Sequence, residues 1–199
     1  KLKTETMKKY WYKTTMLVMA LGAFTACNDD DEPKGPEGPI APVNGAYVIN
    51  TGNWNENNGT IQWYDRDLKT VSADLFAAAN GAGIGDAQDL CIYGSKIYIT
   101  CSSSAKIEIV DRKDFKRIKT LNLTNESGQP IQPRYMTAAK GNIYFTAYDG
   151  TVSQIDTTSL SITQKTEVGG SHPEALTSAN GKLYINLSNY DMDGTGKYV

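Results

Sequence analysis

The sequence predicts an all-β fold, a β-propeller of four-stranded blades, and three observations predict it. First, 12 Tyr and 18 Gly stand against only 4 Phe and 7 Pro, a composition that suits short strands joined by tight turns. Second, a Tyr-bearing strand recurs after a glycine turn. Third, a strand that ends in Asp recurs about every 45 residues, which is a typical length for one propeller blade.

Residues 1–26 are predicted to be a secretory signal peptide with an upstream extension. Met7 is followed by three lysines and then by an apolar run of about ten residues, 15–24. A membrane-spanning helix needs about 20 apolar residues, so this run predicts a signal peptide and not a membrane span. The residues before Met7 are interpreted as translated upstream sequence.

The predicted signal peptide ends in Phe24-Thr25-Ala26-Cys27, which resembles a bacterial lipobox. In that motif the Cys receives lipid and becomes the mature N-terminus, so the resemblance implies lipidation of Cys27. The motif's first position departs from the usual Leu. Lipid chains on Cys27 would hold the protein on the membrane. An ordinary signal peptide with an incidental Cys is the alternative.

Residues 27–43 are predicted to form a tether. An acidic run, 29–32, is followed by a Pro/Gly-rich stretch, 33–42, that cannot build a core. An acidic run directly after a lipidated Cys resembles the surface-export signal of Bacteroidota lipoproteins. The resemblance implies a lipid-anchored protein of the outer membrane, displayed on the cell surface. The alternative is a solvated tether that faces the periplasm.

Residues 44–199 are predicted to be propeller blades. Inner strands that read Ile-Tyr-Ile or Leu-Tyr-Ile are expected to be covered on both faces by neighbouring blades, whereas the outer strands alternate because one face meets water. The repeated segments are the Tyr strands at 45–50, 94–100, 141–146 and 181–186, the Asp strands at 61–65, 107–111 and 152–156, and the outer strands at 117–123 and 162–168.

Local chemistry at the predicted strand ends indicates structural roles for Asp and Cys. Asp65, Asp111 and Asp156 each close a strand, where a short carboxylate can accept the backbone N–H two residues on and so start a turn. Cys91 and Cys101 are predicted to lie on paired strands about 10 Å apart, beyond the reach of a disulfide bond. Both are interpreted as small buried residues.

The segments Val168–Leu176 and Asn180–Asn186 resemble the YVTN-type β-propeller repeat, and Ile97–Leu123 fits the same pattern. That likeness covers residues 44–199 and implies a ring of seven blades. The chain supplies about three and a half blades, which would leave two open sheet edges. We therefore expect the sequence to be a fragment of a longer protein.

The opening segments Asn50–Asn55 and Gly85–Gln88 are similar to those of Bacteroidota surface lipoproteins of this class. Some of those proteins are encoded with TonB-dependent transporters and capture cobalamin. The resemblance implies that the ligand is a corrinoid, handed to such a transporter. Two alternatives stay open: a protein-interaction scaffold in an outer-membrane complex, and a propeller enzyme whose site lies in the missing blades.

Aligning the repeats on their Tyr strands separates two kinds of upstream position. The apolar residues agree from repeat to repeat, whereas the polar ones change identity, so packing dictates the first set and leaves the second free. These segments are expected to line one mouth of the central channel and to bind a large polar ligand or a partner's loops. The alternative is that they are solvated turn residues. The candidate ligand-binding residues are Trp54, Asp86, Gln88, Arg134, Tyr135, Tyr148, His172 and Glu174.

The chain is expected to bind rather than to catalyse. Its single His and few Cys count against most zinc sites and His-based catalysis, and a net charge of −2 gives no electrostatic footprint for nucleic acid. No catalytic residue, metal or cofactor is therefore assigned. Asp191 and Asp193 partly match a calcium-binding loop, but the motif begins with Asn and lacks its final Glu, which favours a hairpin loop.

Overall fold

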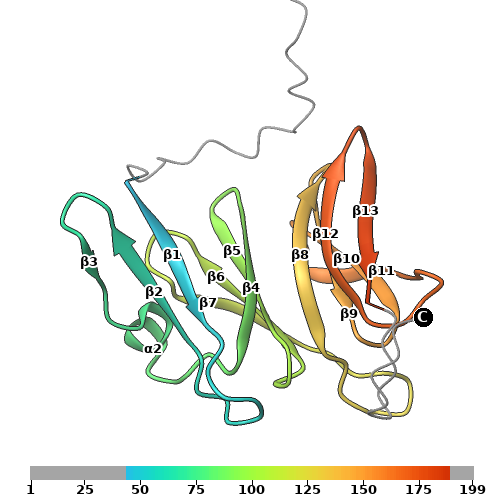
Figure 1. Cartoon of the computed structure of the whole chain (residues 1–199), viewed down its shortest axis with the longest axis horizontal. Coiled ribbons are helices and arrows are strands. Elements are labelled where there is room, and N and C mark those ends of the chain that lie inside the picture. Colours follow the sequence, from blue (N-terminus) through green and yellow to red (C-terminus); the bar gives the residue numbers. More distant parts are fainter. Residues whose placement is uncertain (1–43, 189–199) are drawn as a thin grey trace, which may run out of the picture. The chain divides into compact units, whose positions relative to one another are not determined.

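The computed structural model describes residues 44–188 (Figure 1). These residues belong to one of the chain's two units, Pro33–Val199. The predicted signal peptide, the lipidation site Cys27, the tether and the candidate calcium-binding residues Asp191 and Asp193 lie outside the described residues. Within them the chain forms strands β1 to β13 and one short helix, α2, so the all-β prediction is confirmed.

The strands form successive antiparallel sheets in which each strand pairs with the next along the chain. Two of these sheets have four strands, as the repeat predicts. The first sheet contains β1 (Gly45–Asn50), β2 (Thr60–Asp65) and β3 (Thr70–Val71). The second contains β4 (Ala87–Tyr93), β5 (Lys96–Cys101), β6 (Lys106–Asp111) and β7 (Arg117–Asn122). The third contains β8 (Pro133–Ala139), β9 (Asn142–Ala147), β10 (Thr151–Asp156) and β11 (Ser161–Glu167). The fourth contains β12 (Pro173–Ala179) and β13 (Lys182–Leu187).

The first sheet differs from the predicted repeat. Strand β1 precedes the Asp strand β2 as β5 precedes β6, so among the described residues this sheet has no counterpart of β4. Helix α2 (Leu75–Asn80), which the repeat did not predict, leads from this sheet toward the second. Asp74 caps its N-terminus by accepting a hydrogen bond from the backbone N–H of Phe76, and Gly81 ends it in a left-handed conformation.

Neighbouring sheets meet along their first strands, because β4 lies beside β8 and β8 beside β12. These three strands run in the same direction, so the connecting loops gather at two opposite ends of the strands. We call the edge where β4, β8 and β12 begin the start edge; it includes loops 51–59, 102–105 and 148–150 and lies at the bottom of Figure 1. We call the opposite edge, with the tight turns 66–69, 94–95, 112–116, 140–141 and 180–181, the turn edge.

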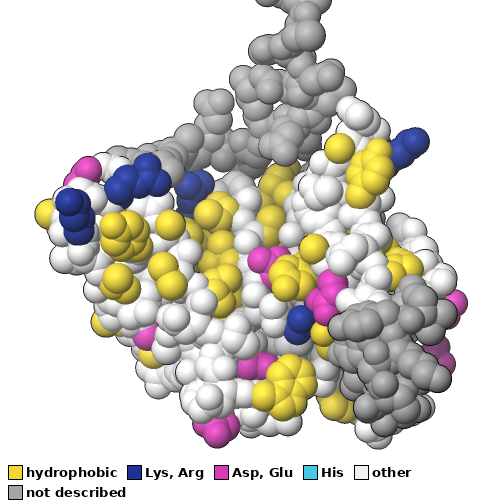
Figure 2. Space-filling model, in the orientation of Figure 1, with side chains coloured by type: hydrophobic (Ala, Val, Ile, Leu, Met, Phe, Trp, Pro, Cys, Tyr) yellow, Lys and Arg dark blue, Asp and Glu magenta, His cyan; other side chains and the backbone are white. Residues whose placement is uncertain are grey.

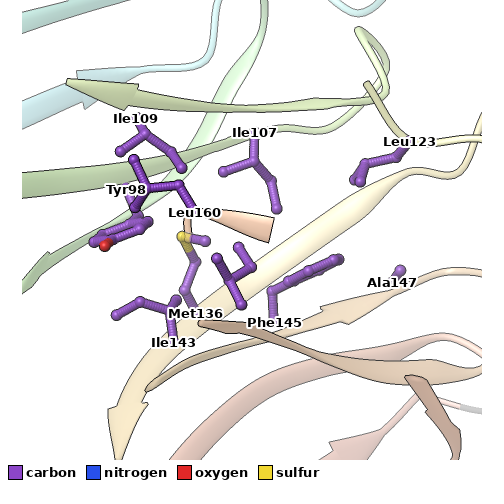
Figure 3. Packing of buried hydrophobic residues seen from close by; sticks show 10 residues of the cluster. Tyr98, Ile107, Ile109, Leu123, Met136, Ile143, Phe145, Ala147 and Leu160 are labelled. Carbon is purple, nitrogen blue, oxygen red and sulfur yellow. The ribbon is translucent and has the colours of Figure 1, made fainter. Parts of the chain in front are cut away.

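The hydrophobic core lies between neighbouring sheets, because alternate residues of one strand point to opposite faces. On β5, Ile97 and Ile99 pack toward the first sheet and α2, where Phe76 is fully buried. Tyr98, between them, packs toward Phe145 and Met136 of the third sheet (Figure 3). Burying each such side chain contributes about 1.5–3 kcal/mol, so each sheet is stabilised by its neighbours.

The local roles predicted for Asp are confirmed. Oδ1 of Asp65 accepts the N–H of the residue two positions on at 2.9 Å, and Asp111 and Asp156 do the same at 2.7 and 3.1 Å. Hydrogen bonds from Ser159 lower the pKa of Asp156. They therefore favour the ionised carboxylate, which is the form that accepts N–H groups in a turn.

The prediction that Cys91 and Cys101 form no disulfide bond is confirmed. Cys91 lies opposite Tyr98 and Cys101 opposite Ala87, and the two cysteines form no disulfide bond with each other. Cys101 is buried, and its burial raises the pKa of its thiol to about 12. Cys91 is only half-buried, which corrects the prediction for that residue.

Replacing Tyr98 with Phe is expected to leave the free energy of unfolding unchanged or to raise it by up to about 1 kcal/mol. The Tyr98 hydroxyl is buried with no hydrogen-bond partner among the described residues, and burial raises its pKa to about 12. Urea titration of the variant measures the change. Tyr144→Phe, at the equivalent position of the third sheet, is the control because that side chain is only half-buried. A loss above about 1 kcal/mol for Tyr98→Phe would show that its hydroxyl has a partner.

Candidate functional site

Three candidate residues are brought together at the start edge by one repeated irregularity. The pairing of each first strand with the second strand skips residues close to its beginning, which is the signature of a β-bulge. Gln88 lies in the bulge of β4, Arg134 in that of β8 and Glu174 in that of β12. Because these strands lie side by side, the three bulges place their polar side chains in one row.

Arg134 joins the row into a hydrogen-bonded cluster. Its Nε donates to Oε2 of Glu174 at 2.9 Å, and its Nη1 donates to Oε1 of Gln88 at 2.9 Å. Nη1 also donates to Oγ of Ser102 at 3.4 Å. The guanidinium thus links side chains from the second, third and fourth sheets, over sequence separations of 40 residues or more.

Aromatic rings flank this cation. Cζ of Arg134 lies 4.6 Å from the ring centroid of Tyr148 and 5.6 Å from that of Tyr135. The Tyr148 hydroxyl donates to Oε1 of Glu174 at 2.6 Å, and the Tyr148 ring meets the His172 ring edge-on at 5.0 Å. Cation–π contacts of this kind contribute about 0.5–2 kcal/mol each, so they hold the guanidinium in place.

Among residues 44–188, the cluster leaves one donor group of Arg134 without an acceptor. Both carboxylate oxygens of Glu174 are engaged, and so are Nε and Nη1 of Arg134, whereas Nη2 of Arg134 makes no hydrogen bond to a described residue. The Arg134 side chain is 13% exposed and that of Glu174 is 17% exposed. A partly buried guanidinium with an open N–H₂ group can donate to a carbonyl or similar acceptor of a bound molecule.

Asp86 lies at the same edge but serves the protein itself. Its carboxylate is buried and accepts hydrogen bonds from the backbone N–H groups of Ser103 and Ser104, at 2.6 and 2.8 Å, and from both hydroxyls. Burial alone would raise the pKa of Asp86, but these hydrogen bonds outweigh it and hold the pKa below its ordinary value. The structure therefore gives Asp86 the role of an anchor for loop 102–105.

Trp54 is placed apart from the Arg134 cluster. Its side chain is 55% exposed, and no ring contact, ion pair or hydrogen bond joins it to the cluster. Its loop is held by its own amide groups: Asn58 Oδ1 accepts the N–H of Asn53 at 2.8 Å, and Asn57 Oδ1 shares the single hydroxyl proton of Ser104 with Asp86 Oδ1. Trp54 is therefore an exposed ring on a fixed loop of the start edge.

Asp89, which was not among the residues predicted to bind a ligand, links two sheets. Its Oδ2 accepts the backbone N–H of Met136 at 2.7 Å, and burial raises the pKa of this carboxyl. The bulge in β8 ends at Met136. A Pro in front of the polar residue, Pro133 or Pro173, was the one sequence signal for these bulges, since Pro within a sheet favours edges and bulges.

A separate cavity of about 220 Å³ lies between the second and third sheets, away from these candidates. Leu123, Ile131 and Phe145 line it together with Lys165, whose Nζ pairs with Asp149 at 2.7 Å. Over residues 44–188, no cluster of three His, Cys, Asp or Glu side chains is placed to hold a metal ion. In the same range no helix is long and apolar enough to cross a membrane.

The comparisons with known proteins show a likeness of fold. No known protein family and no curated protein matches this chain. Among solved structures, the Kuenenia stuttgartiensis hydrazine synthase aligns with a TM-score of 0.54 at 16% identity over 65% of this chain, and the computationally designed Ika8 protein with a TM-score of 0.54 at 13% identity over 78%. The dihydro-heme d1 dehydrogenase NirN in complex with DHE aligns with a TM-score of 0.53 at 10% identity over 71%. The chain spans 36%, 45% and 29% of these three chains respectively, and at such identities the likeness concerns the fold alone.

Proposed function

We propose that the described sheets are blades of a β-propeller. Successive four-stranded antiparallel sheets that meet along their first strands support this, as does the likeness in fold to hydrazine synthase and NirN. In such a ring every sheet face is covered by a neighbour. The outward face of the fourth sheet, with Tyr184 at 52% exposure, and the open edge of β1 are the surfaces that further blades would cover.

We propose that this propeller binds a ligand at the start edge and does not catalyse a reaction. The observation that carries the proposal is the row of three bulges, which aims Gln88, Arg134 and Glu174 into one cluster. Bulges are frequent next to functional sites because they re-aim a side chain. The open Nη2 of Arg134 and the rings of Tyr135 and Tyr148 provide a donor and apolar faces for a large polar molecule.

The ligand that we propose is a corrinoid. A corrinoid is a large flat ring edged with amide groups, whose carbonyl oxygens can accept from the Arg134 guanidinium while the ring system meets aromatic side chains. Glu174 and Asp149 are paired with Arg134 and Lys165, and Asp86 adds an ionised carboxylate, so the charge around the cluster favours a neutral ligand over a polyanion. The sequence resemblance named above supports the same ligand class.

Titration calorimetry with cobalamin on the whole chain tests this proposal. We expect binding at micromolar protein, and we expect Arg134→Gln to weaken it by about tenfold to a hundredfold, because a hydrogen bond from a charged donor contributes about 1.5–3 kcal/mol. Lys113→Gln, at the turn edge, is the control and should bind as the parent chain does. Absence of heat with the folded parent chain would overturn the corrinoid proposal.

Trp54→Ala in the same titration decides whether the fixed loop takes part. An unchanged affinity would remove Trp54 from the site and leave its exposed ring to another role. Weaker binding by Trp54→Ala with a normal unfolding curve would place the ligand across both the cluster and the loop.

We propose further that the protein is a lipid-anchored surface protein that delivers its ligand to a TonB-dependent transporter. The lipobox-like Cys27 and the acidic run after it support the anchor. Labelling of cells with a lipid precursor should mark the parent chain and not Cys27→Ala. Co-purification of an outer-membrane transporter with the parent chain tests the delivery step, and capture without any corrinoid binding would favour the scaffold alternative instead.

A further inference from the structure

Charge is divided between the two edges of the sheets. At the turn edge basic side chains outnumber acidic ones: Arg66, Lys69, Lys96, Arg112, Lys113, Lys116, Lys140 and Lys182 stand against Asp65, Asp67, Asp111, Asp114 and Asp156. At the start edge the reverse holds, with Glu56, Asp86, Asp89, Glu126, Asp149, Glu167 and Glu174 against Lys106, Arg134 and Lys165. In the view of Figure 2, Lys and Arg side chains gather along the upper margin, where the turns lie, and Asp and Glu lie mostly below.

The acidic side chains of the turn edge make local contacts, whereas four of its basic side chains extend into solvent. Asp65, Asp111 and Asp156 direct their carboxylates at backbone N–H groups of their own turns, and Asp114 pairs with Lys116 at 3.4 Å. Among the basic side chains, Lys69, Lys113, Lys140 and Lys182 are exposed and form no ion pair with a described residue. Their ammonium groups stand at the ends of flexible stems that reach into solvent.

The chain leading to the predicted anchor joins the fold at this same edge. Strand β1 begins at the turn edge, and the carbonyl oxygen of Asn44, the first described residue, accepts the N–H of Arg66 in the turn 66–69 at 2.9 Å (Figure 1). Asn44, the first described residue after the predicted anchor, therefore lies beside the basic turn 66–69 and not beside the Arg134 cluster.

From these two observations we propose that the turn edge docks on an anionic lipid surface, so that the start edge points away from the membrane. The inference rests on the proposed lipid anchor at Cys27, since an anchored chain keeps its point of attachment close to the headgroups. Each Lys or Arg near an anionic membrane contributes about 1 kcal/mol, which is enough for several together to orient an already tethered protein.

Vesicle co-sedimentation of the unlipidated Cys27→Ser chain tests the docking without the anchor. We expect it to bind phosphatidylcholine vesicles that contain phosphatidylglycerol and not to bind vesicles of phosphatidylcholine alone. We expect the bound protein to be released as the salt concentration is raised. Lys113→Gln with Lys182→Gln should weaken binding about thirtyfold. The charge control, Lys119→Gln with Lys165→Gln, changes net charge equally but lies on the outer strands β7 and β11, where Lys165 pairs with Asp149, and it should bind as before.

Two results would overturn the proposal. Equal losses in both double variants would mean that net charge and not the turn edge is responsible. Binding that appears only when the acids 29–32 are neutralised would mean that the chain's own acidic run occupies the basic edge. Cobalamin titration of the variant Lys113→Gln with Lys182→Gln separates this proposal from the proposed function. The start edge is unchanged in that variant, so its affinity for cobalamin should equal that of the parent chain even when vesicle binding is lost.

Discussion

Replacing Glu108 with Gln is expected to lower the free energy of unfolding by about 3 kcal/mol, because it removes the anion from a buried ionic cluster. The Glu108 carboxylate on β6 is fully buried and accepts from Lys106 Nζ at 2.8 Å and from Arg117 Nε at 2.9 Å. Thr120 Oγ1 donates to it at 2.8 Å. Two cations would remain without their counter-ion at the interface between the second sheet and α2, where the Arg117 guanidinium lies 5.1 Å from the Phe76 ring centroid.

Urea unfolding measures this loss. Asp114→Asn is the matched control, because Asp114 and Lys116 form an ion pair in which both side chains are exposed. Such surface pairs contribute less than about 1 kcal/mol. If Glu108→Gln cost no more than Asp114→Asn, the buried cluster would have no special part in stability.

Replacing Asp86 with Ala is expected to cost about 3 kcal/mol of stability. The change leaves the N–H and hydroxyl groups of Ser103 and Ser104 without their acceptor in the interior of the start edge. Ser104 also holds loop 51–59 through Asn57, so loosening should spread to that loop. Hydrogen exchange of loops 51–59 and 102–105 measures the spread, with loop 148–150 as the internal control.

The pH dependence of this contribution has a definite sign. Since the folded state holds the pKa of Asp86 below its ordinary value of about 4, its contribution is complete above that value and is lost as pH falls through the folded pKa. The difference in stability between the parent chain and Asp86→Asn should therefore shrink from about pH 5 to about pH 2. A constant difference over that range would contradict the role given to the ionised carboxylate.

Much of the fold could be predicted because packing repeats. Ile97, Ile143 and their counterparts occupy equivalent positions in sheets that cover one another, and this demand shows directly as a repeat of about 45 residues. Helix α2 escaped prediction because it occurs once, in a short alanine-rich run whose capping Asp74 carries no repeat signal. The first sheet departs from the repeat for a related reason: β1 carries the Tyr motif but, in the part of the chain that the structure describes, it is a second strand without a first.

The site could be predicted in membership but not in arrangement. Alignment of the repeats singled out Gln88, Arg134 and Glu174 as equivalent polar positions, and the structure brings them together. It does not bring Trp54 to them, because the loop that carries Trp54 is fixed by its own side chains. The bulges that create the row depend on pairing between strands, which local sequence does not encode beyond Pro133 and Pro173.

The carbonyl groups inside two of the bulges are held by hydroxyls from the preceding sheet. Thr100 Oγ1 donates to the carbonyl oxygen of Arg134, and Thr146 Oγ1 donates to that of Glu174, each at 2.7 Å. The backbone that carries the row is thus already ordered in the free protein, so binding should cost little backbone conformational entropy. Backbone order parameters along β8 and β12 should then differ little between the free and the ligand-bound protein. Thr146→Val removes the hydroxyl that holds the Glu174 carbonyl, so it should make this backbone more mobile and slow association.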